Sequence, residues 1–244
     1  NILSNIKVLD LSQIIAGPLA SMVLGDLGAD VIKIEPPEGE AARHLGETFL
    51  QGESDYLLSL NRNKRSLVID LKRKEGREIF YSLVRKSDVV LENFRPGTME
   101  KLGLDYERLS SLNRRIIYCS ISGFGQNGPY KNRPAMDPII QAMGGIMAIT
   151  GNPQTGPQKV GAPFGDFVAP LLAVIGILGA LRIRDKTGEG QRIDISMLDG
   201  MIFSLIPREG YYFIKGKTLP LRGNEHFQIA PCNTYRTKDE EYIM

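Results

Sequence analysis

Short runs of apolar residues alternate with amphipathic stretches along much of the chain. Runs of about four to eight such residues, bounded by polar or turn-forming residues, are typical of strands buried in a sheet. They occur at 6–11, 30–35, 66–70, 88–92, 115–122 and 191–197. Between two of them, residues 74–85 carry an apolar stripe at helical spacing. Strands that alternate with helices predict an α/β fold, with a parallel sheet flanked by helices.

The same reading along the chain predicts four more helices and a division into two parts. These helices are expected at 16–28, 137–149, 167–184 and 196–215, with Gly28 near the C-cap of the first. A strand–turn–strand opening is predicted at 234–244. We expect a large domain over residues 1–215. Residues 216–244 are expected to be a linker and the beginning of a second, smaller domain, whose remainder is absent from this sequence.

The composition is that of a soluble globular protein, with 42% hydrophobic and 24% charged residues. A formal net charge of +2 gives no reason to expect nucleic acid or an anionic membrane as a partner. The longest nearly uncharged run, from Phe167 to Leu181, has 15 residues, whereas a bilayer takes about 20. We therefore expect a buried helix there and no membrane association.

The two cysteines and the two histidines are too far apart for a CxxC pair or a zinc site, so no metal is expected. Cys119 belongs to the apolar run 116–119, which is typical of a small buried hydrophobe. A chain without a disulfide framework suits a reducing compartment, and we expect it in the cytoplasm.

A glycine motif at 123–128 matches GxGxxG and follows a predicted strand. In a dinucleotide site a helix must open at these glycines, so that its N-terminus meets the pyrophosphate. Here Pro129 and Pro134 flank the next four residues, and the acidic residue expected about 20 positions further on is missing. The motif therefore predicts a glycine-rich turn and no dinucleotide binding.

Two polar segments border predicted strands. Residues 61–66 form a basic cluster, with Lys72 and Arg73 after the strand, which suits either phosphate groups or a solvated loop. Residues 92–97 lie at the carboxyl end of a predicted parallel strand, the edge where open α/β sheets bind ligands. There Asn93 offers an amide and Phe94 a ring that can stack on a planar base. A helix-entry loop is the alternative.

Asp166 follows Gly165 directly before a predicted apolar helix. The ordinary role for an acid in this place is an N-cap, because its oxygen accepts the free amides of the first turn. A rigid carboxylate that is ionised at pH 7 is also suited to covalent catalysis. The residues alone leave both roles open.

Several short motifs occur in a fixed order along almost the whole chain. They are AGP at 16–18, LGDLGADVIKIE at 24–35, NKRS at 63–66, ENFRPG at 92–97, GG at 144–145, GD at 165–166, TGEGQ at 187–191 and DG at 199–200. In this order they resemble the family III CoA-transferases, a group that includes formyl-CoA transferase and carnitine CoA-transferase. The resemblance implies a Rossmann-like large domain and an interlocked homodimer.

The resemblance also implies a reaction: coenzyme A moves from an acyl-CoA, with succinyl-CoA a common donor, to a small free carboxylic acid. Asp166 matches the family's nucleophile, which forms a mixed anhydride and then an aspartyl-CoA thioester. Asp137 aligns with an acid near the thioester. The family's CoA contacts fall on Ile14, Ile15, Ile69, Lys72, Asn93, Phe94 and Lys101. No tightly bound cofactor is implied, since the CoA thioester is the substrate.

Two alternatives are carried forward. An α-methylacyl-CoA racemase, or a dehydratase-like CoA enzyme, belongs to the same superfamily. The racemase needs a histidine base immediately before the acid that aligns with Asp137, where this chain has Met136, which cannot take a proton. The other alternative is a module that binds CoA or a nucleotide without catalysis.

Overall fold

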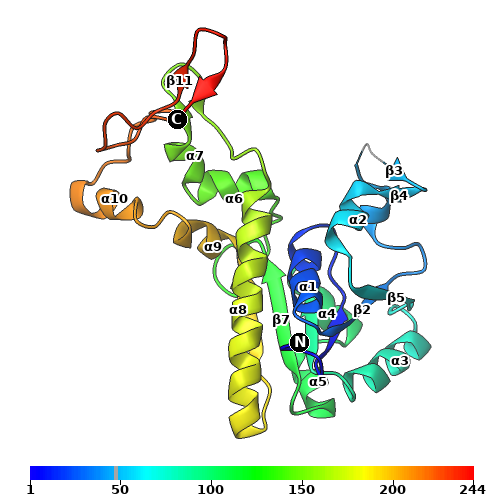
Figure 1. Ribbon diagram of the computed structural model, residues 1–244. Helices are drawn as coiled ribbons and strands as arrows, with labels where there is room; N and C mark the ends of the chain where they lie inside the picture. Colours follow the sequence, from blue (N-terminus) through cyan, green and yellow to red (C-terminus); the bar gives the residue numbers. More distant parts are fainter. Residues whose placement is uncertain (47–48) are drawn as a thin grey trace.

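Six parallel strands form the sheet at the centre of the molecule (Figure 1). The computed structural model describes residues 1–46 and 49–244. Across the sheet the order is β10 (Arg192–Ser196), β7 (Ile117–Ser122), β6 (Val89–Glu92), β1 (Lys7–Asp10), β2 (Asp30–Glu35) and β5 (Lys64–Val68). Each predicted strand has its counterpart in this sheet. The α/β prediction is therefore confirmed, and the strand order reverses between β1 and β6 as in a doubly wound, Rossmann-like fold.

Helices cover both faces of the sheet, which explains why the central strands are continuous apolar runs. Val89 and Leu91 point into a core beneath α1 (Ala16–Asp26) and α8 (Phe164–Thr187). Val90, between them, points into a second core beneath α3 (Lys74–Val84) and α5 (Tyr106–Leu112). The alternation of side chains along a strand thus divides one apolar run between two cores.

The remaining elements lie outside the six-stranded sheet. They are η1 (Ala41–His44), β3 (Phe49–Leu50), β4 (Glu53–Ser54), α2 (Asp55–Leu60), α4 (Thr98–Leu102), α6 (Asp137–Met143), α7 (Ile146–Ile149), β8 (Gly151–Asn152), β9 (Gly156–Pro157), α9 (Met197–Phe203), α10 (Glu209–Lys215), β11 (Tyr235–Arg236) and β12 (Tyr242–Ile243). The antiparallel pair β11–β12 confirms the strand–turn–strand prediction.

The C-terminal residues lead away from the sheet through α9 and α10 and return beside α7 (Figure 1). There the amide of Gly223 donates to the carbonyl of Gly151 at 2.7 Å. Residues 216–244 therefore touch the rest of the chain, and the domain boundary at 215 stays a prediction.

Two predicted helices are interrupted. The helix expected over 137–149 ends at Met143, and α7 begins only after Gly145, whose φ of +87° is left-handed. The single long helix expected over 196–215 was wrong, because α9 ends at Phe203 and α10 begins at Glu209. Between them lies Pro207, which has no N–H to donate and disfavours helical backbone in the residue before it.

Helix α8 is longer than predicted. It has 24 residues, begins three residues earlier than expected and ends three later, so the argument that it is too short for a bilayer was wrong. With a mean hydropathy of 2.1 in its most apolar window, it meets the length and composition of a membrane span. Yet Ala169, Ala173 and Ile177 are fully buried, and the helix packs on α1 and β7. Packing, and not length, supports a buried core helix.

The glycine motif forms a turn, as predicted. No helix lies between β7 and α6 in residues 123–136, all of which the structure describes. Gly125 and Gly128 have φ of +77° and +84°, which L side chains rarely adopt.

The basic cluster at 61–66 ties the edge strand to the sheet. Arg62 pairs with Asp26 at 2.6 Å, and Arg65 pairs with Asp30 at 2.6 Å. The Lys64 side chain is only 2% exposed and pairs with Asp10 at 3.1 Å. Lys64 is therefore a buried partner of the fold, whereas Arg62 and Arg65 are exposed ion pairs, as the interpretation as a solvated cluster predicts; phosphate binding by Lys72 stays a prediction.

Candidate active site

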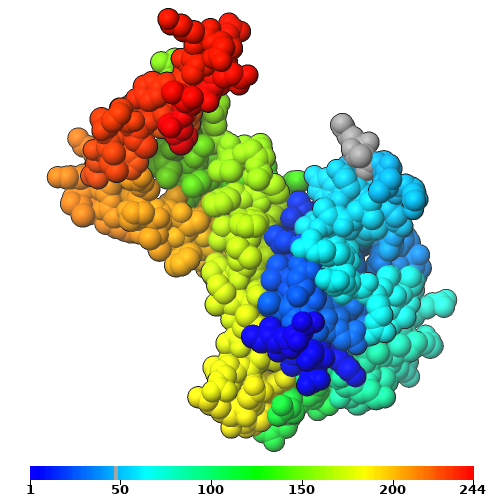
Figure 2. Space-filling view, viewed as in Figure 1, coloured from blue at the N-terminus to red at the C-terminus, as the bar shows by residue number. Residues whose placement is uncertain are grey.

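A cleft of about 780 Å³ opens at the carboxyl ends of β1, β6 and β7. This edge includes the switch point between β1 and β6, where open α/β sheets bind ligands. The cleft walls come from the loops after these strands and from the start of α6 and of α8. Figure 2 shows the hollow between the cyan lobe around α2 and the green and yellow surface of α6 and α8.

A second cavity of about 400 Å³ lies at the carboxyl ends of β2 and β5. Gln13 and Phe94 border both cavities, so the two adjoin. Every residue predicted for the site lies on one of these walls. The first cavity holds Ile14, Ile15, Asn93, Phe94, Asp137 and Asp166, and the second holds Ile69, Lys72, Phe94 and Lys101. The fold therefore brings together all the predicted site residues.

Asp166 lies within the first turn of α8, and the N-cap prediction was wrong. The helix begins at Phe164, and Pro163 occupies the N-cap position. The amide of Gly165 donates instead to Oδ1 of Asp137 at 2.7 Å. An acid from α6 thus satisfies an amide of the first turn, which leaves the Asp166 carboxylate in the cleft without a capping bond.

Gln141 completes the support of this turn, and the sequence interpretation missed it. Its Nε2 donates to Oδ2 of Asp137 at 2.7 Å, and its Oε1 accepts the amide of Val160 at 2.7 Å. Gln141 is fully buried one helical turn after Asp137 on α6. A polar residue four positions after the candidate acid was the signal for this pair. Together the two side chains fix the loop that leads into α8.

The surroundings of Asp166 make it a weaker acid than usual. Burial, and then the negative charge of Asp137, raise the pKa of Asp166 from 3.8 to about 6. A helix N-terminus favours the charged form of a carboxylate, but burial and the charge of Asp137 outweigh this effect on the pKa of Asp166. At pH 7 the carboxylate still predominates, but it is poorly solvated. It is therefore a better nucleophile than an exposed aspartate.

The side-chain amide of Asn93 makes two hydrogen bonds to the backbone of Gln13, and its contact with a ligand stays a prediction. Its Oδ1 accepts the amide of Gln13 at 2.8 Å, and its Nδ2 donates to the carbonyl of Gln13 at 2.9 Å. Asn93 therefore holds the loop after β1 to the loop after β6. The half-buried ring of Phe94 remains on the wall of both cavities.

The chain belongs to the CoA-transferase family III, whose model matches residues 3–244. It is 44% identical over 250 residues to the succinate–glutarate CoA-transferase of Agrobacterium fabrum, covering 99% of this chain and 62% of that one. It is 42% identical over 239 residues to the acetyl-CoA:oxalate CoA-transferase of Acetobacter aceti, covering 97% and 61%. The family prediction is confirmed.

The fold is that of the family. The crystal structure of a CAIB/BAIF family protein from Brucella suis superimposes with a TM-score of 0.93 at 44% identity, over 98% of this chain and 64% of that one. The chain spans about three fifths of the length of the curated relatives named above.

Proposed function

We propose that this chain carries the nucleophile and the acyl-CoA site of an enzyme that transfers CoA from an acyl-CoA to a free carboxylic acid. The observation that carries the proposal is the placement of Asp166. Its carboxylate lies in the larger cleft, beside a second acid that raises its pKa, and this cleft adjoins a cavity that holds two lysines. The names of the relatives add support, since they include succinate, glutarate and oxalate.

In this proposal the smaller cavity takes the nucleotide end of CoA. Lys72 and Lys101 border it, and neither has an ion-pair partner among the residues that the structure describes. Ammonium groups of this kind make charge-assisted hydrogen bonds with phosphates. Ile69 adds an apolar wall, and Phe94 marks the passage to the larger cleft. The thioester then lies on the side of Asp166.

The reaction needs no net transfer of protons. A carboxylate oxygen of Asp166 attacks the thioester carbonyl, and the C–S bond breaks to give a mixed anhydride and CoA thiolate. The thiolate attacks the aspartyl carbonyl of the anhydride, which releases the donor acid as its carboxylate and leaves an aspartyl-CoA thioester. The acceptor carboxylate attacks this thioester, and the thiolate then takes the new acyl group and frees Asp166. Each step is an acyl substitution that covalent catalysis makes easier than direct exchange.

Trapping with hydroxylamine tests the proposal. Succinyl-CoA plus hydroxylamine should convert Asp166 to its hydroxamate, which intact-mass measurement and peptide mapping detect. Asp166→Asn should give no adduct and no transfer, yet bind CoA as the wild type does, because the amide keeps the shape of the carboxylate. An unmodified Asp166 under conditions where succinyl-CoA is consumed contradicts the proposal. CoA binding with neither consumption nor adduct indicates a binding module.

Among the described residues that line the cleft there is no histidine to serve as the racemase base. Met136 lies at the N-cap of α6 and is 74% exposed, and neither histidine is among the described residues that line the cleft. Incubation of a single chiral 2-methylacyl-CoA without an acceptor acid should therefore leave its α-carbon unchanged. Epimerisation under these conditions contradicts the transferase proposal.

We further propose that the protein is a homodimer. Helix α10 has no buried residue, and Phe213 and Ile214 are each 79% exposed. Neighbouring apolar side chains at this exposure are typical of a surface that a protein partner covers. Sedimentation equilibrium of the full-length protein should give twice the monomer mass. A monomer at micromolar concentration contradicts this proposal.

A further inference from the structure

A strained residue lies on the wall of the larger cleft. Ile14 has a φ of +69°, in the left-handed region, where the Cβ of an L residue crowds its own backbone. For a β-branched side chain this conformation is a genuine outlier. The other non-glycine residues with positive φ, among those that the structure describes, are Gln51, Asn63 and Glu240, and none of them lines the cleft. Strain of this kind persists only where the surroundings impose it.

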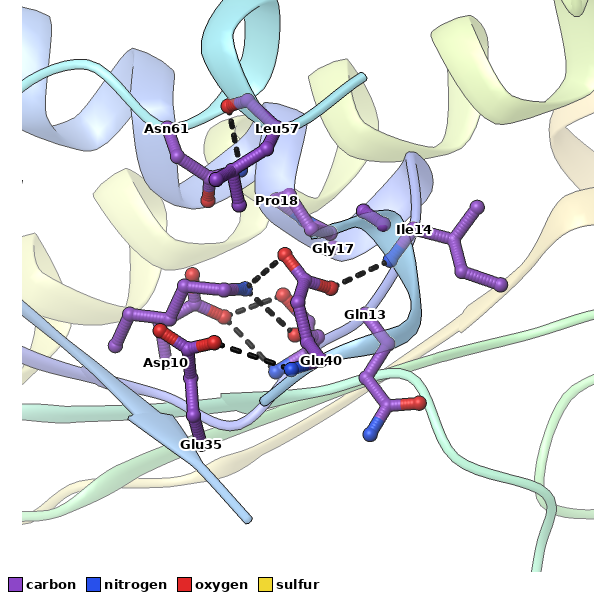
Figure 3. Close-up of polar contacts among 12 residues, drawn as sticks. Asp10, Gln13, Ile14, Gly17, Pro18, Glu35, Glu40, Leu57 and Asn61 are labelled. Carbon is purple, nitrogen blue, oxygen red and sulfur yellow. Dashed lines mark hydrogen bonds and ion pairs between the residues drawn. The ribbon is translucent and has the colours of Figure 1, made fainter. Parts of the chain in front are cut away.

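One buried carboxylate binds the backbone at Ile14. The amide of Ile14 donates to Oε2 of Glu40 at 3.0 Å, and Glu40 is 1% exposed (Figure 3). The other oxygen of Glu40, Oε1, pairs with Nζ of Lys33 at 3.0 Å. A hydrogen bond to a buried, charged acceptor is stronger than one between neutral groups. Glu40 is therefore in a position to offset the strain at residue 14.

Lys33 holds the same loop two residues earlier. Its Nζ donates to the carbonyl of Ser12 at 2.9 Å, and Asn93 binds the backbone of Gln13 between the two points. Lys33 comes from β2, and Glu40 from the loop before η1. The pair thus joins the segment after β2 to the loop after β1, which forms the cleft wall.

Stability does not explain the pair. Lys33 and Glu40 are 2% and 1% exposed, and the cost of removing two charges from water often equals or exceeds their attraction in a buried pair. Apolar residues of the same size fill such a space at least as well. The geometry instead indicates that the two charged side chains hold the loop, because each also binds a backbone group of residues 12–14.

We propose that Lys33 and Glu40 are a positioning pair for acyl-CoA. They hold Ile14 in the left-handed conformation and so place the side chains of Ile14 and Ile15 on the cleft wall that Asp166 shares. The inference rests on the proposed function, in which Ile14 and Ile15 contact acyl-CoA. Without the Glu40 acceptor, residue 14 relaxes to negative φ and the wall changes shape. The thioester is then displaced from Asp166, and a displacement of about 1 Å costs about a hundredfold in rate.

The first test compares two charge-neutral double variants of the full-length protein, so that no buried charge is left unpaired. In Lys33→Met/Glu40→Gln an amide oxygen still accepts the Ile14 amide, whereas Lys33→Met/Glu40→Leu has no acceptor. We expect kcat/KM for succinyl-CoA to be about ten- to a hundredfold lower in the Leu variant than in the Gln variant. Thermal unfolding of both variants confirms that they are folded. Equal kcat/KM in the two folded variants overturns the proposal.

The second test separates the backbone of residue 14 from its side chain. Ile14→Gly and Ile14→Ala both remove the side chain, but only glycine adopts positive φ without strain. On Ile14→Gly the difference between the Gln and Leu variants should shrink to about twofold or less, and on Ile14→Ala it should persist. A merely structural role of the pair predicts the same difference on both backgrounds, which overturns the proposal.

Crystal structures of the two double variants test the inference without an activity assay. The backbone of residue 14 should stay left-handed in Lys33→Met/Glu40→Gln and leave that region in Lys33→Met/Glu40→Leu. A left-handed residue 14 in both variants overturns the positioning role. A wild type that transfers no CoA contradicts the proposed function instead, and the two failures are thus distinguished.

Discussion

The charge of Asp137 should be visible in the pH dependence of catalysis. The rise in the pKa of Asp166 from 3.8 to about 6 corresponds to about 3 kcal/mol in favour of the protonated carboxyl. Burial is the larger cause of this rise and Asp137 the second. The substitution Asp137→Asn removes the charge but keeps an oxygen that accepts the Gly165 amide. It should therefore remove less than half of the effect, which is less than about 1.5 kcal/mol, or about one pH unit.

The direction of this pH dependence follows from the ionisation state in which Asp166 reacts. Because the carboxylate of Asp166 is the proposed nucleophile, kcat/KM of the wild type should be constant above neutrality and fall about tenfold per pH unit below pH 6. In Asp137→Asn the midpoint of this fall should move to between about pH 5 and pH 6. The phosphates of CoA titrate equally in both proteins and cancel from the comparison.

Stopped assays of kcat/KM from pH 4.5 to 8.5 measure the two midpoints. Gln141→Met is the matched control, because it removes the bond to Asp137 but keeps both carboxylates. The midpoint of Gln141→Met should stay the same or rise, because the Asp137 carboxylate loses the hydrogen bond that Gln141 donates. The reasoning is refuted if Asp137→Asn keeps the wild-type midpoint or moves it upwards, whatever happens to the plateau.

Three further results follow from the structure. Lys72→Ala and Lys101→Ala should each raise KM for succinyl-CoA about three- to tenfold with little change in kcat, because in the proposed function the smaller cavity holds the nucleotide end of CoA and not the reacting bond. Lys86→Ala, at an exposed position outside both cavities, should change neither. Ile177→Ala should lower the free energy of unfolding by about 2–5 kcal/mol, whereas Ile175→Ala, on the exposed side of the same helix, should cost less than about 0.5 kcal/mol in the monomer; urea unfolding measures both. Burial raises the pKa of Glu92 to about 7. The protonated Glu92 carboxyl therefore contributes fully to the stability of the fold below about pH 4.5, and this contribution is lost as the pH rises through 7. Glu92→Gln should therefore gain up to about 3 kcal/mol relative to the wild type between pH 4 and pH 8, and a constant difference between the two contradicts this.

Local patterns predicted the sheet because a strand buried on both faces must be apolar at every position. Val89, Val90 and Leu91 show this directly, since they serve two different cores. The break between α9 and α10 was missed because apolar residues continue through it, and one residue, Pro207, outweighs the periodicity. Helix ends, which depend on single residues, are harder to predict than buried strands.

The chemistry of the site was less accessible from the sequence, because it depends on contacts between distant segments. Asp166 is not an N-cap, since an acid 29 residues earlier, Asp137, takes the amide of Gly165. Nor does isoleucine at position 14 indicate a left-handed backbone; its identity favours a strand. The amide of Ile14 donates to Glu40, which lies in another loop and to which we attribute this conformation. What the family resemblance contributed was the set of residues, while their geometry required the fold.

The transfer of an oxygen atom to Asp166 tests the central claim most directly. In the proposed reaction the acceptor carboxylate attacks the aspartyl thioester, and one of its oxygens stays on Asp166 when the new acyl-CoA forms. After turnover with succinyl-CoA and glutarate labelled with oxygen-18, the peptide that contains Asp166 should carry the label. A peptide that remains unlabelled after many turnovers would show that the acids exchange CoA without passing through Asp166.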